Sequence, residues 1–374
     1  MENRKELLKG TKRVVVKFGT TTLTNHEGQL NYPKIAKIVK ELTQLLEDGY
    51  EVVVVSSGAV GAGMGVLQLS EKPKAICEKQ AVAAIGQVEL IQLYQKLFRN
   101  HGVMIGQLLL TKNDFSRRVS YLNARNVCRT LLAKKIIPII NENDSVVADE
   151  IKVGDNDTLS ALVAGLIDAD MLIIVSDVDG LYDKNPQTHL DAKLLSYVPQ
   201  VTKTVRKAAS GEGSKFGTGG MHTKIIAAEM ATKNGTNLAI ISGENPNNIT
   251  KLLAGAQIGT VFAKQDKKIT SRKYWLAYSS VDDGVISIDA GAENALKQRK
   301  SLLPVGVKKV MGKFDIGAVI AIQNQQGDII AKGITNYTAT EIIQIQGIHS
   351  EDIEKILGYK YDDVIIHIDN LILL

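Results

Sequence analysis

Cysteine is scarce in this sequence: Cys77 and Cys128 are its 2 cysteines in 374 residues, and neither belongs to a CxxC pair. They cannot build the disulfide framework of a secreted domain, so we expect both to pack as small hydrophobic side chains in a reducing, cytoplasmic setting. Residues 1–13 are charged and lack the apolar region of a secretory signal. The longest apolar stretches, such as Val52–Val55 and Met171–Val175, are strand-sized and too short for a membrane span. A soluble protein is therefore expected.

A strong excess of either charge is also missing. The 45 Lys and Arg residues against 40 Asp and Glu leave a net charge of +5, too small by itself to indicate nucleic-acid binding. No Walker A, HExxH or nucleophile-elbow motif occurs in the sequence, so P-loop, zinc and serine-hydrolase chemistry have no support. With 44% hydrophobic and 23% charged residues, the composition is that of an ordinary globular protein.

The first two thirds of the chain alternates apolar, β-branched runs with helical patterns. Pro33 suits the first turn of a helix that Gly49 ends. Strands are predicted at 13–18, 51–55, 103–110, 136–140, 171–175 and 238–242, and further helices at 76–98, 121–133, 157–167 and 221–234. This alternation predicts an α/β fold with a mainly parallel central sheet layered between helices.

The pattern changes near the C-terminus. Short alternating runs at 285–288, 318–322, 329–331, 342–345 and 364–368 are predicted as strands. We therefore expect one domain at 1–264, a linker at 265–279 and a small, mostly β domain at 280–374. The segment 272–374 carries a net charge of −2 and the remainder +7, so the positive charge belongs to the α/β part.

Polar and glycine-rich segments follow four of the predicted strands, where ligands bind in open α/β sheets. These segments are 17–21, 56–65, 141–144 and 176–180. Glycines let backbone N–H groups approach a phosphate, although Gly58–Gly65 fits close helix–sheet packing equally well. Lys17 ends an otherwise apolar strand, and burying its charge costs free energy unless it meets an anion. Lys17 is therefore a candidate phosphate contact.

Two further segments carry candidate binding groups. Gly217–Lys224 joins glycines, Thr hydroxyls and a Lys at the start of a predicted helix, which favours phosphate binding. The polar residues of 143–144 and 153–157 would suit either a hard cation or a substrate ammonium group. Asp157 also fits a helix N-cap or a first-turn acid. The residues alone leave these alternatives open.

Six segments, in this order and at these spacings, resemble the glutamate 5-kinase family. They are Val15–Thr20, Ser56–Ala59, Asn141–Asp144, Lys152–Asp157, Asp177–Tyr182 and Gly217–Lys224. The resemblance covers nearly the whole chain and implies an amino-acid kinase fold followed by a PUA domain. It also implies phosphorylation of the L-glutamate side-chain carboxylate by ATP with Mg²⁺, which is the first step of proline biosynthesis.

The resemblance assigns roles to individual residues. It implies that Lys17 and Lys224 contact phosphate and that Asp157 orients them. Three residues would bind glutamate: Ser57, Asp144 and Asn156. The nucleotide would contact Lys17, Ser176, Asp177, Thr218, Gly219, Gly220, Met221, His222, Thr223 and Lys224. His222 stands where the family more often has a small hydroxyl residue, and no residue is assigned to the metal.

The implied chemistry agrees with the residues and leaves two alternatives. A carboxylate with an ordinary pKa of about 4.3 is already ionised, so no general base is needed.

We expect feedback inhibition by proline and a homo-oligomer. One alternative is another amino-acid kinase, acting on acetylglutamate or aspartate. The other is RNA binding through the PUA-like domain, against which the net charge of −2 and the single tryptophan argue.

Overall fold

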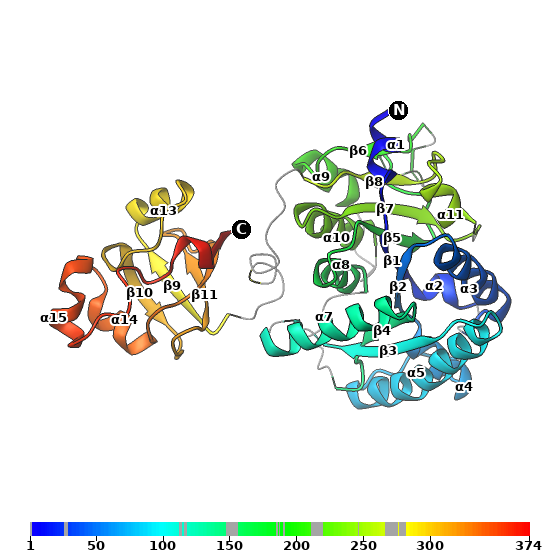
Figure 1. Cartoon of the computed structure of the whole chain (residues 1–374), viewed down its shortest axis with the longest axis horizontal. Coiled ribbons are helices and arrows are strands. Elements are labelled where there is room, and N and C mark those ends of the chain that lie inside the picture. The colour runs from blue at the N-terminus through cyan, green and yellow to red at the C-terminus, as the bar shows by residue number, and fades with distance from the viewer. Residues whose placement is uncertain are drawn as a thin grey trace. The chain divides into compact units, whose positions relative to one another are not determined.

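The computed structural model describes residues 2–25, 29–111, 114–115, 118–146, 156–184, 186, 188–189, 191–210, 220–245, 247–265, 276 and 282–374. The chain divides into two compact units, and Figure 1 shows the elements of each. The first unit is Met1–Asp114 with Arg118–Ile269, and the second is Phe115–Arg117 with Thr270–Leu374. Among the described residues, no helix is long and apolar enough to cross a membrane.

The first unit is built on an eight-stranded sheet in the order β3-β4-β2-β1-β5-β7-β8-β6. Its strands are β1 (Arg13–Phe18), β2 (Glu51–Ser56), β3 (Ile105–Leu110), β4 (Ile137–Glu142), β5 (Met171–Ser176), β6 (Tyr197–Val198), β7 (Asn237–Ser242) and β8 (Thr260–Phe262). Of the pairings between these strands, only that of β7 with β8 is antiparallel. The predicted, mainly parallel sheet is confirmed.

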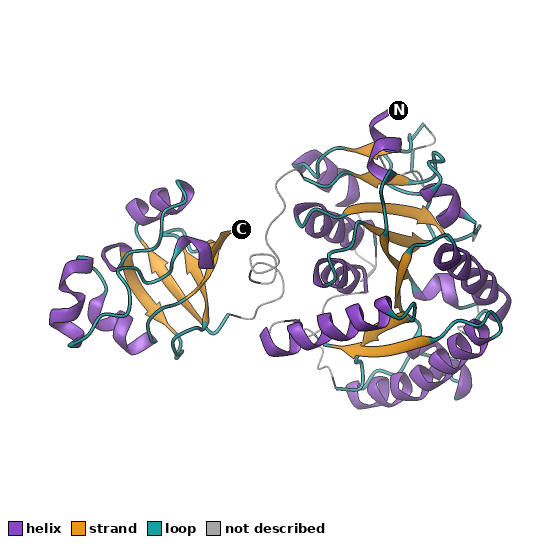
Figure 2. Cartoon of the chain, viewed as in Figure 1, coloured by secondary structure: helices purple, strands orange, loops and turns teal. Residues whose placement is uncertain are grey.

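Helices lie on both faces of this sheet, as Figure 2 shows. They are α1 (Glu2–Leu8), α2 (Thr20–Leu23), α3 (Tyr32–Glu47), α4 (Ala59–Val66), α5 (Ile76–Arg99), α7 (Arg118–Ala133), α8 (Asn156–Leu166), α9 (Lys203–Ser210), α10 (Met221–Lys233) and α11 (Asn248–Leu253). Side chains alternate along β1: Val16 and Phe18 join the core that α3 and α5 cover. Lys17 therefore points to the other face, where it contacts α8.

Local sequence explains how α3 begins and ends. The Asn31 side chain accepts a hydrogen bond from the Lys34 N–H, and Pro33 occupies the first turn. Gly49 follows the helix with a φ of 91°, a left-handed conformation that glycine adopts without strain. The amphipathic face of α3 then packs its buried side chains on the sheet.

The glycine-rich run after β2 is a helix, α4, rather than the loop that its composition indicates. Tertiary packing decides this segment, because α4 lies directly against α5. A Cβ on Gly63 would lie 2.0 Å from the Val82 carbonyl oxygen, and one on Gly86 would lie 1.8 Å from that of Ala59. These glycines therefore serve close packing between two helices.

The second unit holds a five-stranded sheet in the order β10-β9-β11-β12-β13. Its elements are β9 (Gly284–Ile288), α13 (Ala290–Lys297), β10 (Val307–Met311), β11 (Val319–Gln323), β12 (Ile329–Ile334), α14 (Ala339–Ile345), α15 (Ile353–Leu357) and β13 (Leu371–Leu373), with 3₁₀ turns at Pro304–Gly306, Ser350–Asp352 and Ile368–Asn370. Its own hydrophobic core lies between this sheet and the helices.

Two predicted strands of this unit are wrong. The run 342–345 belongs to α14, which begins at a capping box between Thr338 and Glu341. The run 364–368 is irregular and makes a single bridge at Ile366. A short apolar run fits a buried helix turn as well as a strand, so periodicity alone misassigns it.

Candidate active site

Three residues that lie far apart in the sequence meet at the carboxyl end of the sheet. Lys17 comes from β1, Asp157 from the first turn of α8 and Lys224 from the first turn of α10. Lys17 Nζ lies 2.6 Å from Asp157 Oδ1, and Lys224 Nζ lies 3.2 Å from Asp157 Oδ2. We call these three residues the charged triad. All three are buried, with exposed fractions of 7%, 1% and 5%.

The charged triad combines one negative and two positive groups. Burial acts to raise the pKa of the Asp157 carboxyl, but the charges and hydrogen bonds of Lys17 and Lys224 outweigh it and lower that pKa. The carboxylate is therefore ionised at neutral pH. Because a surplus positive charge in a buried position costs free energy, the triad favours an anion beside it.

Helix ends add to this positive potential. The first turns of α8 and α10 both reach the triad, so the positive ends of their helix dipoles lie near it. Thr223 Oγ1 lies 3.0 Å from Asp157 Oδ2 and 2.9 Å from the carbonyl oxygen of Gly220, the residue that precedes α10. At Gly19, a Cβ would lie 3.6 Å from Lys17 Nζ. Glycine at this position therefore leaves the backbone beside the lysine without a covering side chain, which suits a phosphate site.

A second cluster begins one residue before Asp157. Asn156 Nδ2 lies 2.7 Å from Ser57 Oγ, 3.2 Å from the Ser56 carbonyl oxygen and 3.1 Å from Asn141 Oδ1. Asn141 Nδ2 in turn donates to Gln87 Oε1 over 2.8 Å. We call Ser57, Asn156, Asn141 and Gln87 the amide cluster. Because Asn156 and Asp157 are consecutive, it adjoins the charged triad.

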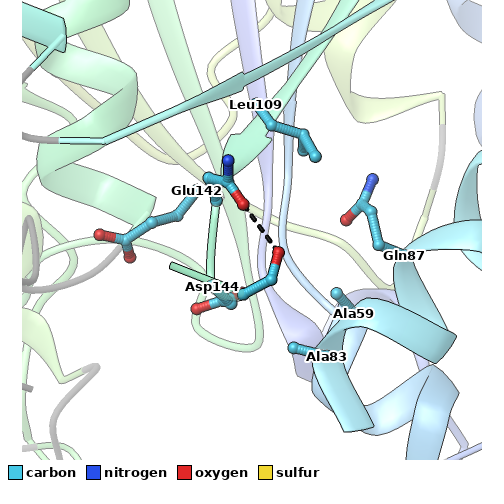
Figure 3. A pocket seen from close by; sticks show the side chains of 8 residues that line it. Ala59, Ala83, Gln87, Leu109, Glu142 and Asp144 are labelled. Atoms are coloured by element: carbon cyan, nitrogen blue, oxygen red, sulfur yellow. Dashed lines mark hydrogen bonds between the residues drawn. The ribbon is translucent and has the colours of Figure 1, made fainter. Parts of the chain in front are cut away.

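A small, solvent-open pocket lies beside the amide cluster. Figure 3 shows Gln87 on one side of it and Asp144 on the other. Its remaining lining residues are Ala59, Ala83, Leu109, Glu142, Asn143 and Ser145. Ser145 Oγ donates to Asn143 Oδ1 over 2.8 Å, which orders the turn that carries Asp144. The pocket thus joins a polar side chain of α5 with polar side chains from the end of β4 and the turn that follows it.

The predicted nucleotide residues are only partly brought to the triad. Ser176 ends β5, next to β1, and its hydroxyl donates to Asp177 over 2.9 Å rather than to a lysine. Met221 is half-buried and His222 exposed in the first turn of α10. Thr218 and Gly219 lie outside the described residues, as does Asp155 of the predicted polar cluster.

Sequence reasoning gave no role to Asn141 or Gln87. Asn141 lies inside a segment that was recognised, but nothing in the pattern separates it from its polar neighbours. Gln87 lies 54 residues before Asn141, within a helix whose spacing indicates packing only. Their pairing depends on the order of strands and helices in the fold, so the sequence carried no signal for it.

Comparison with known proteins agrees with this architecture. The amino acid kinase family model matches residues 12–242, and the PUA domain model matches residues 284–357. The chain is 48% identical over 363 residues to the glutamate 5-kinase of Caldanaerobacter subterraneus, covering 97% of this chain and 98% of the relative. It is also 48% identical to the glutamate 5-kinase of Pasteurella multocida, and the match covers 98% of this chain and 100% of that relative. UMP kinase of Bacillus anthracis covers 69% of this chain and 98% of its own, at 15% identity and a TM-score of 0.49.

Proposed function

The chain belongs to the amino acid kinase family and, within it, to the glutamate 5-kinases, and from this we propose that it transfers the γ-phosphoryl group of ATP to the side-chain carboxylate of L-glutamate. The product would be L-glutamate 5-phosphate, the first intermediate of proline biosynthesis. The observation that carries the proposal is the charged triad, with two buried lysines on one buried carboxylate at the edge of the sheet.

The reaction needs charge neutralisation rather than proton transfer. An oxygen of the ionised γ-carboxylate forms a bond to the γ-phosphorus while the bond to the β,γ-bridging oxygen breaks and ADP leaves. No proton moves, which fits a charged triad of two ammonium groups and an already ionised carboxylate. Positive groups that face the equatorial oxygens stabilise the charge that gathers there in the transition state.

We assign the triad residues distinct tasks. Lys17 and Lys224 would contact the phosphoryl oxygens, and Asp157 would hold both ammonium groups in place. Without the carboxylate, two buried ammonium groups would repel each other at close range. The Thr223 hydroxyl beside Asp157 supports the same geometry.

We assign Mg²⁺ to the nucleotide rather than to a protein site. Among the residues that the structure describes, no group of three or more His, Cys, Asp or Glu side chains could hold a metal ion, and the Asp157 carboxylate already faces two lysines. Mg²⁺ commonly reaches an active site on substrate phosphates with few protein ligands. The metal would thus enter as part of the MgATP substrate and neutralise phosphate charge there.

We place glutamate in the pocket beside the amide cluster. Asp144 lines it and could pair with the α-ammonium group, while Ser57 and Asn156 offer polar contacts nearer the triad. Since Asn156 and Asp157 are adjacent, this placement brings the acceptor carboxylate next to the lysines.

We also propose two partners beyond the substrates. Proline shares the α-carboxylate and α-nitrogen of glutamate, so the same pocket could take it as a feedback inhibitor. Activity at low glutamate that stays unchanged in millimolar proline would contradict this. A homo-oligomer is proposed because apolar side chains are exposed on α4 and α5 and directly after α4, among them Val66, Leu67, Ile85 and Val88. Light scattering that gives a monomer mass would exclude it.

Trapping of the acyl phosphate with hydroxylamine tests the proposed function. With ATP and glutamate, we expect a hydroxamate to form in step with ADP. Aspartate and N-acetylglutamate should give little product. Faster turnover of either would assign the chain to a different amino acid substrate.

A further inference from the structure

The amide cluster has a fixed direction, which a backbone group determines. The Glu142 N–H donates to the Asn141 side chain over 2.9 Å, and a backbone N–H can only donate. The Asn141 atom that faces it must therefore be the oxygen. Asn141 thus turns its NH₂ group toward Gln87, so the facing Gln87 atom must be its oxygen.

The same direction passes on to Asn156. Because Asn141 Oδ1 is an acceptor, the Asn156 atom 3.1 Å away must be Nδ2. Asn156 Nδ2 also meets Ser57 Oγ and the Ser56 carbonyl oxygen, so three acceptors hold one NH₂ group. Asn156 Oδ1 is therefore turned away from them, and the described residues offer it no hydrogen-bond donor. Together with the Asp144 carboxylate, an acceptor of this kind suits the ammonium group of an amino acid.

We infer that Gln87 is a positioning residue for glutamate binding, acting through Asn141 on Asn156; the inference rests on the proposed function. Without an acceptor at Gln87, the NH₂ group of Asn141, a residue with an exposed fraction of 2%, loses its partner. Asn141 could then regain a partner only by moving away from Asn156. Gln87 also lines the pocket together with Asp144 (Figure 3).

Gln87→Met tests the inference because it keeps the length of the side chain and removes the acceptor. We expect the KM for glutamate to rise roughly 5- to 30-fold, the range that the loss of one buried hydrogen bond produces. The kcat and the KM for ATP should stay within about twofold, because Gln87 touches neither the triad nor the nucleotide residues. Gln92→Met, an exposed position on the same helix, is the matched control and should behave like the wild type.

A double-mutant cycle separates positioning from a structural role. In an Asn156→Ala background, Gln87→Met should raise the KM for glutamate by less than about twofold, because its target is gone. An unchanged KM in the single variant, or an equal rise in both backgrounds, would overturn the inference. So would an equal rise in the KM for ATP. Gln87→Leu repeats the test should the Met variant melt early, and a wild-type chain inactive with glutamate would instead reject the proposed function.

Discussion

At the scale of single residues, the charged triad makes kinetic predictions that separate its members. Lys17→Met and Lys224→Met should each lower kcat by roughly 10²–10³ while raising the KM for glutamate much less, since they remove charge that matters most in the transition state. Asp157→Asn should resemble them, because it frees two ammonium groups that now share one carboxylate. A helix-capping role for Asp157 would instead cost about 1 kcal/mol of stability and leave the kinetics intact.

Asp144→Ala is the contrasting variant for the same assay. It should raise the KM for glutamate strongly and lower kcat less, because it removes a contact to a group that does not react. Steady-state kinetics and a thermal melt on all four variants give the answer. If the lysine variants kept a normal kcat and only bound ATP more weakly, the lysines would contact the phosphates of bound ATP without stabilising the transition state.

Glu41 on α3 predicts a pH-dependent stability. Its carboxylate accepts hydrogen bonds from the N–H and the hydroxyl of Thr250 at 2.9 and 3.0 Å. Burial raises the pKa of the Glu41 carboxyl from 4.5 to about 7, although these hydrogen bonds and the charge of Lys251 act to lower it. The folded chain therefore keeps this proton to a higher pH than the unfolded chain. The free energy of unfolding therefore falls by up to about 3 kcal/mol as the pH rises from about 4.5 to about 7, and it stays lower above pH 7.

Glu41→Gln keeps an oxygen for Thr250 and removes the titration. Its melting temperature should exceed the wild-type value by roughly 5 °C at pH 8 and differ little near pH 4.5. Glu47→Gln, at an exposed position of the same helix, should show no such trend. A constant difference between the Glu41 variant and the wild type from pH 4.5 to pH 8 would mean that Glu41 is charged throughout.

The sequence alone predicts some residues of the site and not others. Lys17 could be selected directly, because a lysine at the end of an apolar strand needs an anion. Asp157 could not, since an N-cap fitted equally well and only the resemblance favoured a link to the lysines. Gln87 was beyond reach, because its contact with Asn141 exists only once α5 packs beside β4.

At the scale of elements, the packing of α4 on α5 shapes the pocket in which we propose that glutamate binds. Gly63→Ala should destabilise the fold by roughly 1–3 kcal/mol, because its Cβ would lie 2.0 Å from a backbone oxygen of α5. It should also raise the KM for glutamate, since α4 begins two residues after Ser57. Gly65→Ala is the control: its nearest atom would be the flexible Gln29 Cγ at 3.2 Å. A Gly63 variant with wild-type stability and KM would show that α4 shifts without cost.

The elements show where pattern reasoning fails. Strands β1, β2 and β5 follow from short β-branched runs, because burial on both faces leaves a continuous apolar signature. The glycine-rich α4 and the four-residue run in α14 do not follow, because packing decides them against local preference. The start of α3 follows from Pro33, whose fixed backbone angle suits the first turn of a helix.

At the scale of the whole molecule, the triad and the amide cluster belong entirely to the first unit. A chain that ends at Lys273 should therefore still phosphorylate glutamate, with kcat within about threefold of the full chain, provided that the unit folds alone. Circular dichroism establishes folding and the hydroxamate assay gives the rate. A folded but inactive fragment would show that the second unit completes the site.

In the proposed reaction, the side-chain carboxylate of glutamate itself attacks the γ-phosphorus of ATP. The most direct measurement uses glutamate labelled with ¹⁸O in its side-chain carboxylate, with hydroxylamine present to cleave the acyl phosphate at carbon. The phosphate released should carry one ¹⁸O atom per hydroxamate formed, visible as an isotope shift in ³¹P NMR. Phosphate without the label would mean that water, not glutamate, attacks ATP, and would contradict the account.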